Sequence, residues 1–258
     1  MSSQSTQSTD GTANTDDVLR LENVTKRFGG VVAVDDLSFS VHDREILGFI
    51  GPNGAGKSTT FNCVSGAFPP TDGKVYYRDE DITGVPQYAL VEKGLARTYQ
   101  TFRPLDDRTV LENVSLSMVP NKLFSIEEFR TDVEDRAKDI CQQVGLTEYM
   151  HQTPDELPHA GLLRLEVGRA LGTDPNLLLV DEPFAGLTPE EVERTATLFR
   201  SLRENGMTLI VIDHNMHGLL DLVDRVVVIS FGEKIAEGSP EEIRNDPTVQ
   251  EAYLGGEL

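Results

Sequence analysis

The sequence predicts an α/β fold with a mostly parallel central sheet, an antiparallel β subdomain and a helical subdomain. An apolar segment at 45–50 leads into a glycine-rich loop and then into a segment that can continue as a helix. Further apolar runs at 176–181, 208–213 and 225–230 alternate with helical patterns. Such alternation is typical of a parallel sheet, whose ligands bind at the carboxyl ends of the strands.

Composition narrows the classes of function. The chain has 258 residues and a net charge of −20, from 43 acidic and 23 basic residues, which argues against nucleic acid as a partner because phosphate backbones select basic surfaces. The acid-rich, lysine-poor composition resembles that of halophilic proteins from salt-loaded cytoplasm, with an ordinary acidic protein as the alternative. No apolar run approaches the ~20 residues of a membrane span, and no apolar signal segment opens the chain.

The N-terminal part is expected to hold a tail and the first strands. Residues 1–17 are almost all small or polar, so we expect a disordered tail, followed by one domain over 18–258. Strands are expected at 19–24, 37–41 and 74–77. Cys63 and Cys141 lie far apart and are expected to be buried small hydrophobes rather than a disulfide or a metal site.

A phosphate-binding loop is the most specific motif. Eight residues fit the pattern G-x-x-x-x-G-K-[ST], and with the following Thr59 they make up the expected nucleotide contacts: Gly51, Pro52, Asn53, Gly54, Ala55, Gly56, Lys57 and Ser58. Glycines let the backbone wrap a phosphate chain, and the helix N-terminus presents partial positive charge to it. Lys57 would reach the β- and γ-phosphates, and Ser58 would hold Mg²⁺. The alternative is a glycine-rich turn before an ordinary helix.

A helical insert is expected at about 101–165. Ser125 and Glu128 form a capping box, and apolar residues then recur at helical spacing until Gly145. In the second half, Thr188 with Pro189 and Glu191 predicts a helix start, and Asn205-Gly206 its end. The residues from about 238 to 258 form a C-terminal extension.

Asp181 and Glu182 directly follow the apolar run at 177–180. A carboxylate after such a strand is how a Mg²⁺-organising Asp is delivered beside a phosphate loop. Glu182 then stands where a general base could polarise a water molecule for attack on the γ-phosphate. Alone, the pair is weak evidence, because many such pairs only cap the next loop; with the loop at 51–58 it is strong.

With these motifs, the chain from Val18 to Leu258 resembles the ATP-binding subunits of ABC transporters. The resemblance implies a P-loop NTPase fold of the ABC ATPase type, with ATP and Mg²⁺ as cofactors. It implies that Gln100 contacts Mg²⁺ and the attacking water, that His214 contacts the γ-phosphate, and that Phe28 stacks on adenine. The alternatives are a surface imidazole for His214 and a core or surface ring for Phe28.

The segment at 157–161, here called the signature segment, departs from the family pattern L-S-G-G-Q. It keeps the leucine, and the helix after it keeps Arg169-Ala170-Leu171, but the other positions read Pro158, His159, Ala160 and Gly161. Ala160 stands at the second glycine unless Gly161 has shifted to serve. In the family this loop contacts the γ-phosphate held by the opposite subunit, so the departure concerns the partner's site and favours a heterodimer.

Within the family, several segments are similar to branched-chain amino acid uptake ATPases of the LivG type, including those at 28–35, 96–100, 182–187 and 251–255. The resemblance implies an ATPase subunit on the cytoplasmic face of the membrane. Its expected partners are transmembrane permease subunits docked near Gln100, a second ATPase subunit and, indirectly, an extracellular substrate-binding protein. The alternatives are urea or amide uptake, another transporter, a soluble ABC ATPase outside transport, or a regulatory subunit that cannot support hydrolysis.

Overall fold

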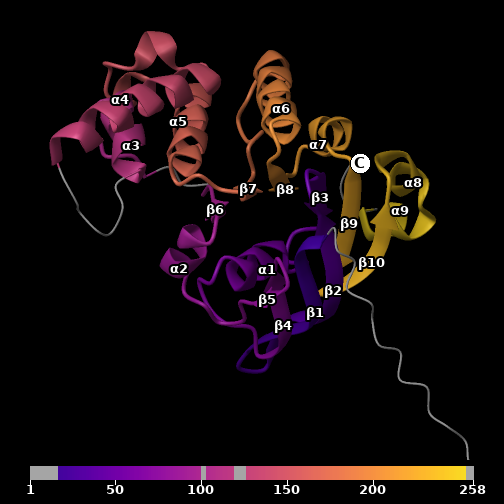
Figure 1. Ribbon diagram of the computed structural model, residues 1–258. Coiled ribbons are helices and arrows are strands. Elements are labelled where there is room, and N and C mark those ends of the chain that lie inside the picture. Colours follow the sequence, from indigo (N-terminus) through magenta and orange to yellow (C-terminus); the bar gives the residue numbers. More distant parts are fainter. Residues whose placement is uncertain (1–16, 100–102, 119–125, 254–258) are drawn as a thin grey trace, which may run out of the picture.

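The computed structural model describes residues 17–99, 103–118 and 126–253, with backbone alone for 126–131. The chain forms two sheets with helices around them (Figure 1). The central sheet has the strand order β10-β9-β3-β8-β7-β6. Its members are β3 (Ile46–Ile50), β6 (Leu95–Arg97), β7 (Leu177–Asp181), β8 (Thr208–Ile212), β9 (Arg225–Ser230) and β10 (Glu233–Gly238). All neighbours pair in parallel except β10, which is antiparallel to β9 at one edge. The predicted parallel sheet is therefore confirmed.

The second sheet is antiparallel, with the order β2-β1-β4-β5. Its strands are β1 (Asp17–Phe28), β2 (Val31–His42), β4 (Asp72–Tyr77) and β5 (Glu80–Asp81). The first two are longer than expected, because β1 and β2 pair along their whole length and absorb several register shifts. Asp17, assigned to the tail in the sequence analysis, is instead the first residue of β1 and accepts a hydrogen bond from His42 at 2.8 Å.

Three helices group at one end of the molecule (Figure 1). They are α3 (Val110–Ser117), α4 (Ile126–Gln143) and α5 (His159–Gly172), with short 3₁₀ turns at Thr147–Tyr149 and Pro154–Glu156. Helix α5 runs past the expected boundary near 165 because Val167, Ala170 and Leu171 are buried in the core. Ser125 of the predicted capping box lies outside the described residues, as do residues 1–16.

The remaining helices are α1 (Lys57–Val64), α2 (Gln87–Glu92), α6 (Pro189–Glu204), α7 (Met216–Leu222), α8 (Pro240–Asn245) and α9 (Pro247–Tyr253). Helix α6 begins as predicted, since Thr188 and Glu191 form a capping box around Pro189. None of the helices in the described ranges is long and apolar enough to cross a membrane.

Two apolar clusters cover the two faces of the central sheet. Along β3, Ile46 and Ile50 belong to the cluster with α3 to α7, whereas Leu47 and Phe49 belong to the cluster with α1 and the antiparallel sheet. This alternation follows from the period of two along a strand. Both cysteines are buried and free, and burial raises the pKa of each thiol to about 11. The layers leave the carboxyl ends of the strands at one edge, where the candidate site lies.

Candidate nucleotide-binding site

The phosphate loop, residues 51–58, lies between β3 and α1, as predicted. Gly54 and Gly56 have φ of 81° and 107°, in the left-handed region that favours glycine. A Cβ atom on Gly56 would clash with the carbonyl oxygen of Ala33, and one on Gly51 with that of Ile229. The glycines are thus required by close packing of the loop as well as by its conformation.

Lys57 lies within this loop. Its side chain is buried, and Nζ donates hydrogen bonds to the carbonyl oxygens of Gly51 at 2.5 Å and Pro52 at 3.0 Å. Burial lowers the pKa of Lys57, while the negative charges of Glu182 and Asp181 oppose that shift. A phosphate chain would supply this ammonium with negative charge that two carbonyl oxygens only partly replace. Ser58 is exposed in the first turn of α1, where its hydroxyl is accessible.

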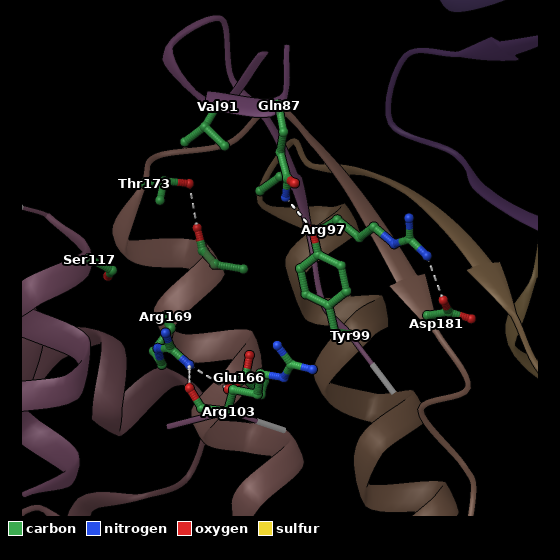
Figure 2. Close-up of a pocket in the computed structure, with 12 residues that line it drawn as sticks. Gln87, Val91, Arg97, Tyr99, Arg103, Ser117, Glu166, Arg169, Thr173 and Asp181 are labelled. Atoms are coloured by element: carbon green, nitrogen blue, oxygen red, sulfur yellow. Dashed lines mark hydrogen bonds and ion pairs between the residues drawn. The ribbon is translucent and has the colours of Figure 1, made fainter. Parts of the chain in front are cut away.

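Asp181, at the carboxyl end of β7, forms an ion pair with Arg97 from the neighbouring strand β6 (Figure 2). Arg97 Nη2 lies 2.8 Å from Asp181 Oδ2, and both side chains are largely buried. The sequence analysis did not assign Arg97 to the site. The available signal was an arginine at the end of an otherwise apolar strand.

Glu182 and His214 meet across the ends of β7 and β8. His214 Nε2 lies 2.8 Å from Glu182 Oε1. Glu182 has φ of 52°, an unusual value for a residue other than glycine, and its amide donates to the carbonyl oxygen of Ile212 at 2.8 Å. Strained backbone of this kind clusters at functional sites. The structure thus brings two of the predicted catalytic residues into contact.

Asp213 is a second residue that the sequence analysis left without a role. Its buried carboxylate accepts hydrogen bonds from the amide of Phe184 at 2.7 Å and from that of Asn215 at 2.7 Å. Burial raises the pKa of Asp213, and the two backbone hydrogen bonds oppose the shift. Asp213 therefore ties the loop after Glu182 to the loop that carries His214.

Phe28 stands apart from these contacts. Phe28 ends β1 and is 48% exposed, with its ring edge-to-face against Phe68 at 5.5 Å. Lys26 Nζ lies over both rings. The exposed ring is available to stack, although no contact joins it to the phosphate loop. Gln100 lies outside the described residues, and Thr59 follows Ser58 in the first turn of α1.

The signature segment leads directly into α5, which begins at His159 with Pro158 as its N-cap residue. Gly161 is buried in the first turn, against Leu157 and Pro158, so it is not placed as an exposed loop glycine. His159 Nε2 lies 3.0 Å from the carbonyl oxygen of Ala185. The segment is therefore tied to the loop that follows Glu182 in the same subunit.

A cavity of about 620 Å³, here called the cleft, separates this part of the central sheet from the helical group (Figure 2). Arg169 on its wall donates to Glu166 Oε1 at 2.6 Å and to the carbonyl oxygen of Arg103 at 3.0 Å. Asp181 and Arg97 line the same cleft. The candidate metal carboxylate thus lines the cleft between the central sheet and the helical group.

A glycine-rich loop between a strand and a helix, with an Asp-Glu pair ending a nearby parallel strand, defines a P-loop nucleotide-binding protein. Residues 34–185 match the profile of the family described as ABC transporter, and residues 233–258 match that of the branched-chain amino acid ATP-binding cassette transporter. The chain belongs to the family of ABC transporter ATP-binding proteins, as its sequence predicts.

Similar proteins cover nearly the whole chain. The high-affinity branched-chain amino acid transport ATP-binding protein LivG of Salmonella typhimurium is 36% identical over 249 residues, 92% of this chain and 98% of that protein. The crystal structure of the ADP conformation of an ATP-binding cassette of an ABC transporter has a TM-score of 0.85 at 32% identity, covering 93% of this chain and 99% of the other. A dimeric post-hydrolysis cassette bound to ADP and Pi has a TM-score of 0.75 at 25% identity, covering 86% and 98%.

Proposed function

We propose that this chain is the ATP-hydrolysing subunit of an ABC importer for branched-chain amino acids. The observation that carries the enzymatic part is the contact between Glu182 and His214 at 2.8 Å, at the same sheet edge as a complete phosphate loop. The transport part is supported by the LivG relatives and by the match of residues 233–258. It is also consistent with a fold shared along nearly the whole length of a transporter cassette.

The residues fit a magnesium nucleotide. No cluster of three or more His, Cys, Asp or Glu side chains that could hold a metal occurs in the described part of the chain. Mg²⁺ needs no such cage, because it binds one or two protein oxygens together with substrate phosphates and water. Ser58 and Asp181 would supply those protein oxygens, with Gln100 added from the family resemblance. When bound, Mg²⁺ would supply positive charge that offsets the charge of the phosphates.

Binding and hydrolysis divide among the other residues. Lys57 and the amides of the phosphate loop would hold the phosphates, and Phe28 would stack on adenine. The Glu182 carboxylate would accept a proton from the attacking water as its oxygen bonds to the γ-phosphorus and the bond to ADP breaks. His214 would donate to the γ-phosphate, in place of its contact with Glu182, once nucleotide binds.

We propose the cleft as the docking place of a permease helix, which puts the subunit on the cytoplasmic face of the membrane. Two ATPase subunits would sandwich two ATP molecules, and the altered signature segment favours a heterodimer. An extracellular binding protein would deliver the amino acid to the permease. The acid-rich composition supports work in a salt-loaded cytoplasm.

The first experiment measures the mass in solution of Glu182→Gln with and without ATP and Mg²⁺, in molar potassium chloride so that charge repulsion is screened. We also expect Glu182→Gln to hydrolyse ATP about 10²- to 10⁴-fold more slowly than the wild-type protein and still to bind ATP. The matched control is Lys57→Ala/Glu182→Gln, which should stay monomeric. An ATP-dependent dimer would make a homodimer credible, whereas a monomer that binds ATP would point to a partner cassette. Full turnover in Glu182→Gln would remove Glu182 from the mechanism.

Substrate class is tested with the permease complex in vesicles. We expect ATP-dependent uptake of leucine, isoleucine and valine, and no uptake of urea or amides. Uptake of urea, without uptake of these amino acids, would instead assign the protein to the urea-uptake subunits of the family. ATP turnover that the permease complex leaves unchanged would instead support a soluble ATPase.

A further inference from the structure

Arg97 is a buried cation that joins three elements of the candidate site. Figure 2 shows its contact with Asp181. Nη2 contacts Asp181 Oδ2 at the end of β7 at 2.8 Å. Nη1 donates to Asn62 Oδ1 at 2.7 Å and to Ser65 Oγ at 3.1 Å, on and just after α1. Arg97 itself ends β6, the strand that leads toward Gln100. One guanidinium thus links the helix after the phosphate loop, the candidate metal carboxylate and the strand beside the cleft.

The position of this guanidinium is constrained on its faces as well as on its edges. Its central carbon lies 5.5 Å from the ring centre of Phe61 and 5.1 Å from that of Tyr99. Within the described residues, Nε is a buried donor without a hydrogen-bond partner. An unpaired buried donor costs stability, so the arrangement is not the one that stability alone favours. It indicates that the positions of the two Nη groups matter more than a hydrogen bond for Nε.

The contact leaves the Asp181 carboxylate in a defined orientation. Arg97 occupies Oδ2, and the Asp181 amide donates to Thr98 Oγ1 at 3.4 Å. No hydrogen bond or ion pair to Oδ1 occurs within the described part of the chain. When a hydrogen bond holds one oxygen of a carboxylate, the other oxygen points in a fixed direction. Hydrogen-bond partners of metal ligands generally orient the ligands in this way. Lysine could supply the charge but not the several directed bonds of a planar guanidinium.

We infer that Arg97 is a positioning residue for the magnesium nucleotide, which holds the Asp181 carboxylate in register with the phosphate loop. The inference rests on the proposed function, because it requires that Asp181 serve the metal. Arg97 acts through Asp181 and α1 and contacts no nucleotide itself. The competing interpretation is a purely structural ion pair, whose loss would lower stability and leave the effect of Mg²⁺ on ATP binding unchanged.

The test compares ATP affinity with Mg²⁺ and with a chelator, by calorimetry on the full chain carrying Glu182→Gln so that ATP is not consumed. The quantity of interest is the factor by which Mg²⁺ strengthens ATP binding. In Arg97→Met we expect this factor to fall about 10- to 100-fold, the usual cost of losing a partner of a metal ligand. ATP binding in chelator should stay within about 3-fold, and Arg97→Lys should be intermediate.

Arg225→Met is the matched control. Arg225 is also a buried arginine, paired with Glu45 and Glu237, but it begins β9 and so lies at the opposite edge of the sheet from the site. Its loss should lower the midpoint of thermal unfolding without changing the factor by which Mg²⁺ strengthens ATP binding, here called the Mg²⁺ factor. If Arg97→Met behaves like Arg225→Met, the inference is wrong. If Arg97→Met does not fold, Arg97→Lys and the double variant below decide.

A double-mutant cycle with Asp181→Asn separates this inference from the proposed function. If Arg97 acts through Asp181, Arg97→Met should add no further loss of the Mg²⁺ factor in the Asp181→Asn background. An additive loss would overturn the inference. If the parent Glu182→Gln protein showed no strengthening of ATP binding by Mg²⁺, the proposed function itself would fail.

Discussion

The phosphate loop and the signature segment are two loops that each lead into a helix N-terminus, yet they differ in how their sequence relates to the family pattern. The phosphate loop matches its pattern at every defined position, and a Cβ on Gly51 or Gly56 would strike backbone carbonyl oxygens. The signature segment keeps only Leu157 of its pattern, and α5 still begins there, at His159.

The difference shows where packing constrains a loop. Gly51 and Gly56 of the phosphate loop pack against the backbone of their own subunit, so a side chain at either position would disturb the fold as well as the site. The signature segment is exposed at Pro158 and His159, whereas Gly161 is buried in the first turn of α5. Its exposed positions can therefore change at little cost to the fold.

The largest effect is expected from a substitution in the phosphate loop. Lys57→Ala should weaken ATP binding about 30- to 4000-fold, because it removes a buried charge from the phosphates, a contact worth about 2–5 kcal/mol. Thermal stability should change little, since burial already lowers the pKa of Lys57 and disfavours its charged form. Calorimetric titration with ATP and Mg²⁺ measures the first effect. The exposed Lys74→Ala is the control, and equal affinities for the two variants would refute the assignment of the loop.

A smaller effect is expected from substitution of Asp213. Asp213→Ala removes the hydrogen bond from the Phe184 amide, which ties the segment after Glu182 to the His214 loop, and the bond from the Asn215 amide, which lies within the His214 loop. We expect turnover to fall about 10- to 100-fold, because a shift of about 1 Å in a catalytic group has effects of this size. Asp213→Asn, which keeps one acceptor oxygen, should lose less. Steady-state ATPase rates measure the turnover of each variant, with the exposed Asp221→Ala as control. If Asp213→Ala had the same rate as the control, Glu182 and His214 would keep their positions without the Asp213 carboxylate.

The smallest effect concerns the signature segment. His159→Ala removes the hydrogen bond to the Ala185 carbonyl oxygen, worth about 0.5–1.5 kcal/mol. We expect the ATP-dependent dimer of Glu182→Gln to weaken about 2- to 10-fold, with ATP affinity of the monomer unchanged. Analytical ultracentrifugation measures both states, and His217→Ala on the exposed face of α7 is the control. A loss of monomer ATP affinity would contradict the separation of the two loops.

Most of the central sheet and the phosphate site could be predicted, because each depends on residues adjacent in sequence. Asp181 and Glu182 directly follow an apolar strand, and the loop at 51–58 directly follows another. Parallel strands deliver such residues to one edge whatever their order in the sheet. The extents of β1 and β2 were predicted less well, since the pairing of the two strands decides them.

The sequence by itself determined the family, the phosphate loop and the carboxylates that follow β7, because these are local patterns with a direct physical meaning. Only the tertiary structure decided which side chains meet. Strand β7 lies between β6 and β8, and Arg97 pairs with Leu179 and Asp181 with Ile212. That order brings Arg97 to Asp181, His214 to Glu182, and Asp213 to the Phe184 amide. These contacts join residues far apart in the chain, so they exist only once the sheet has formed.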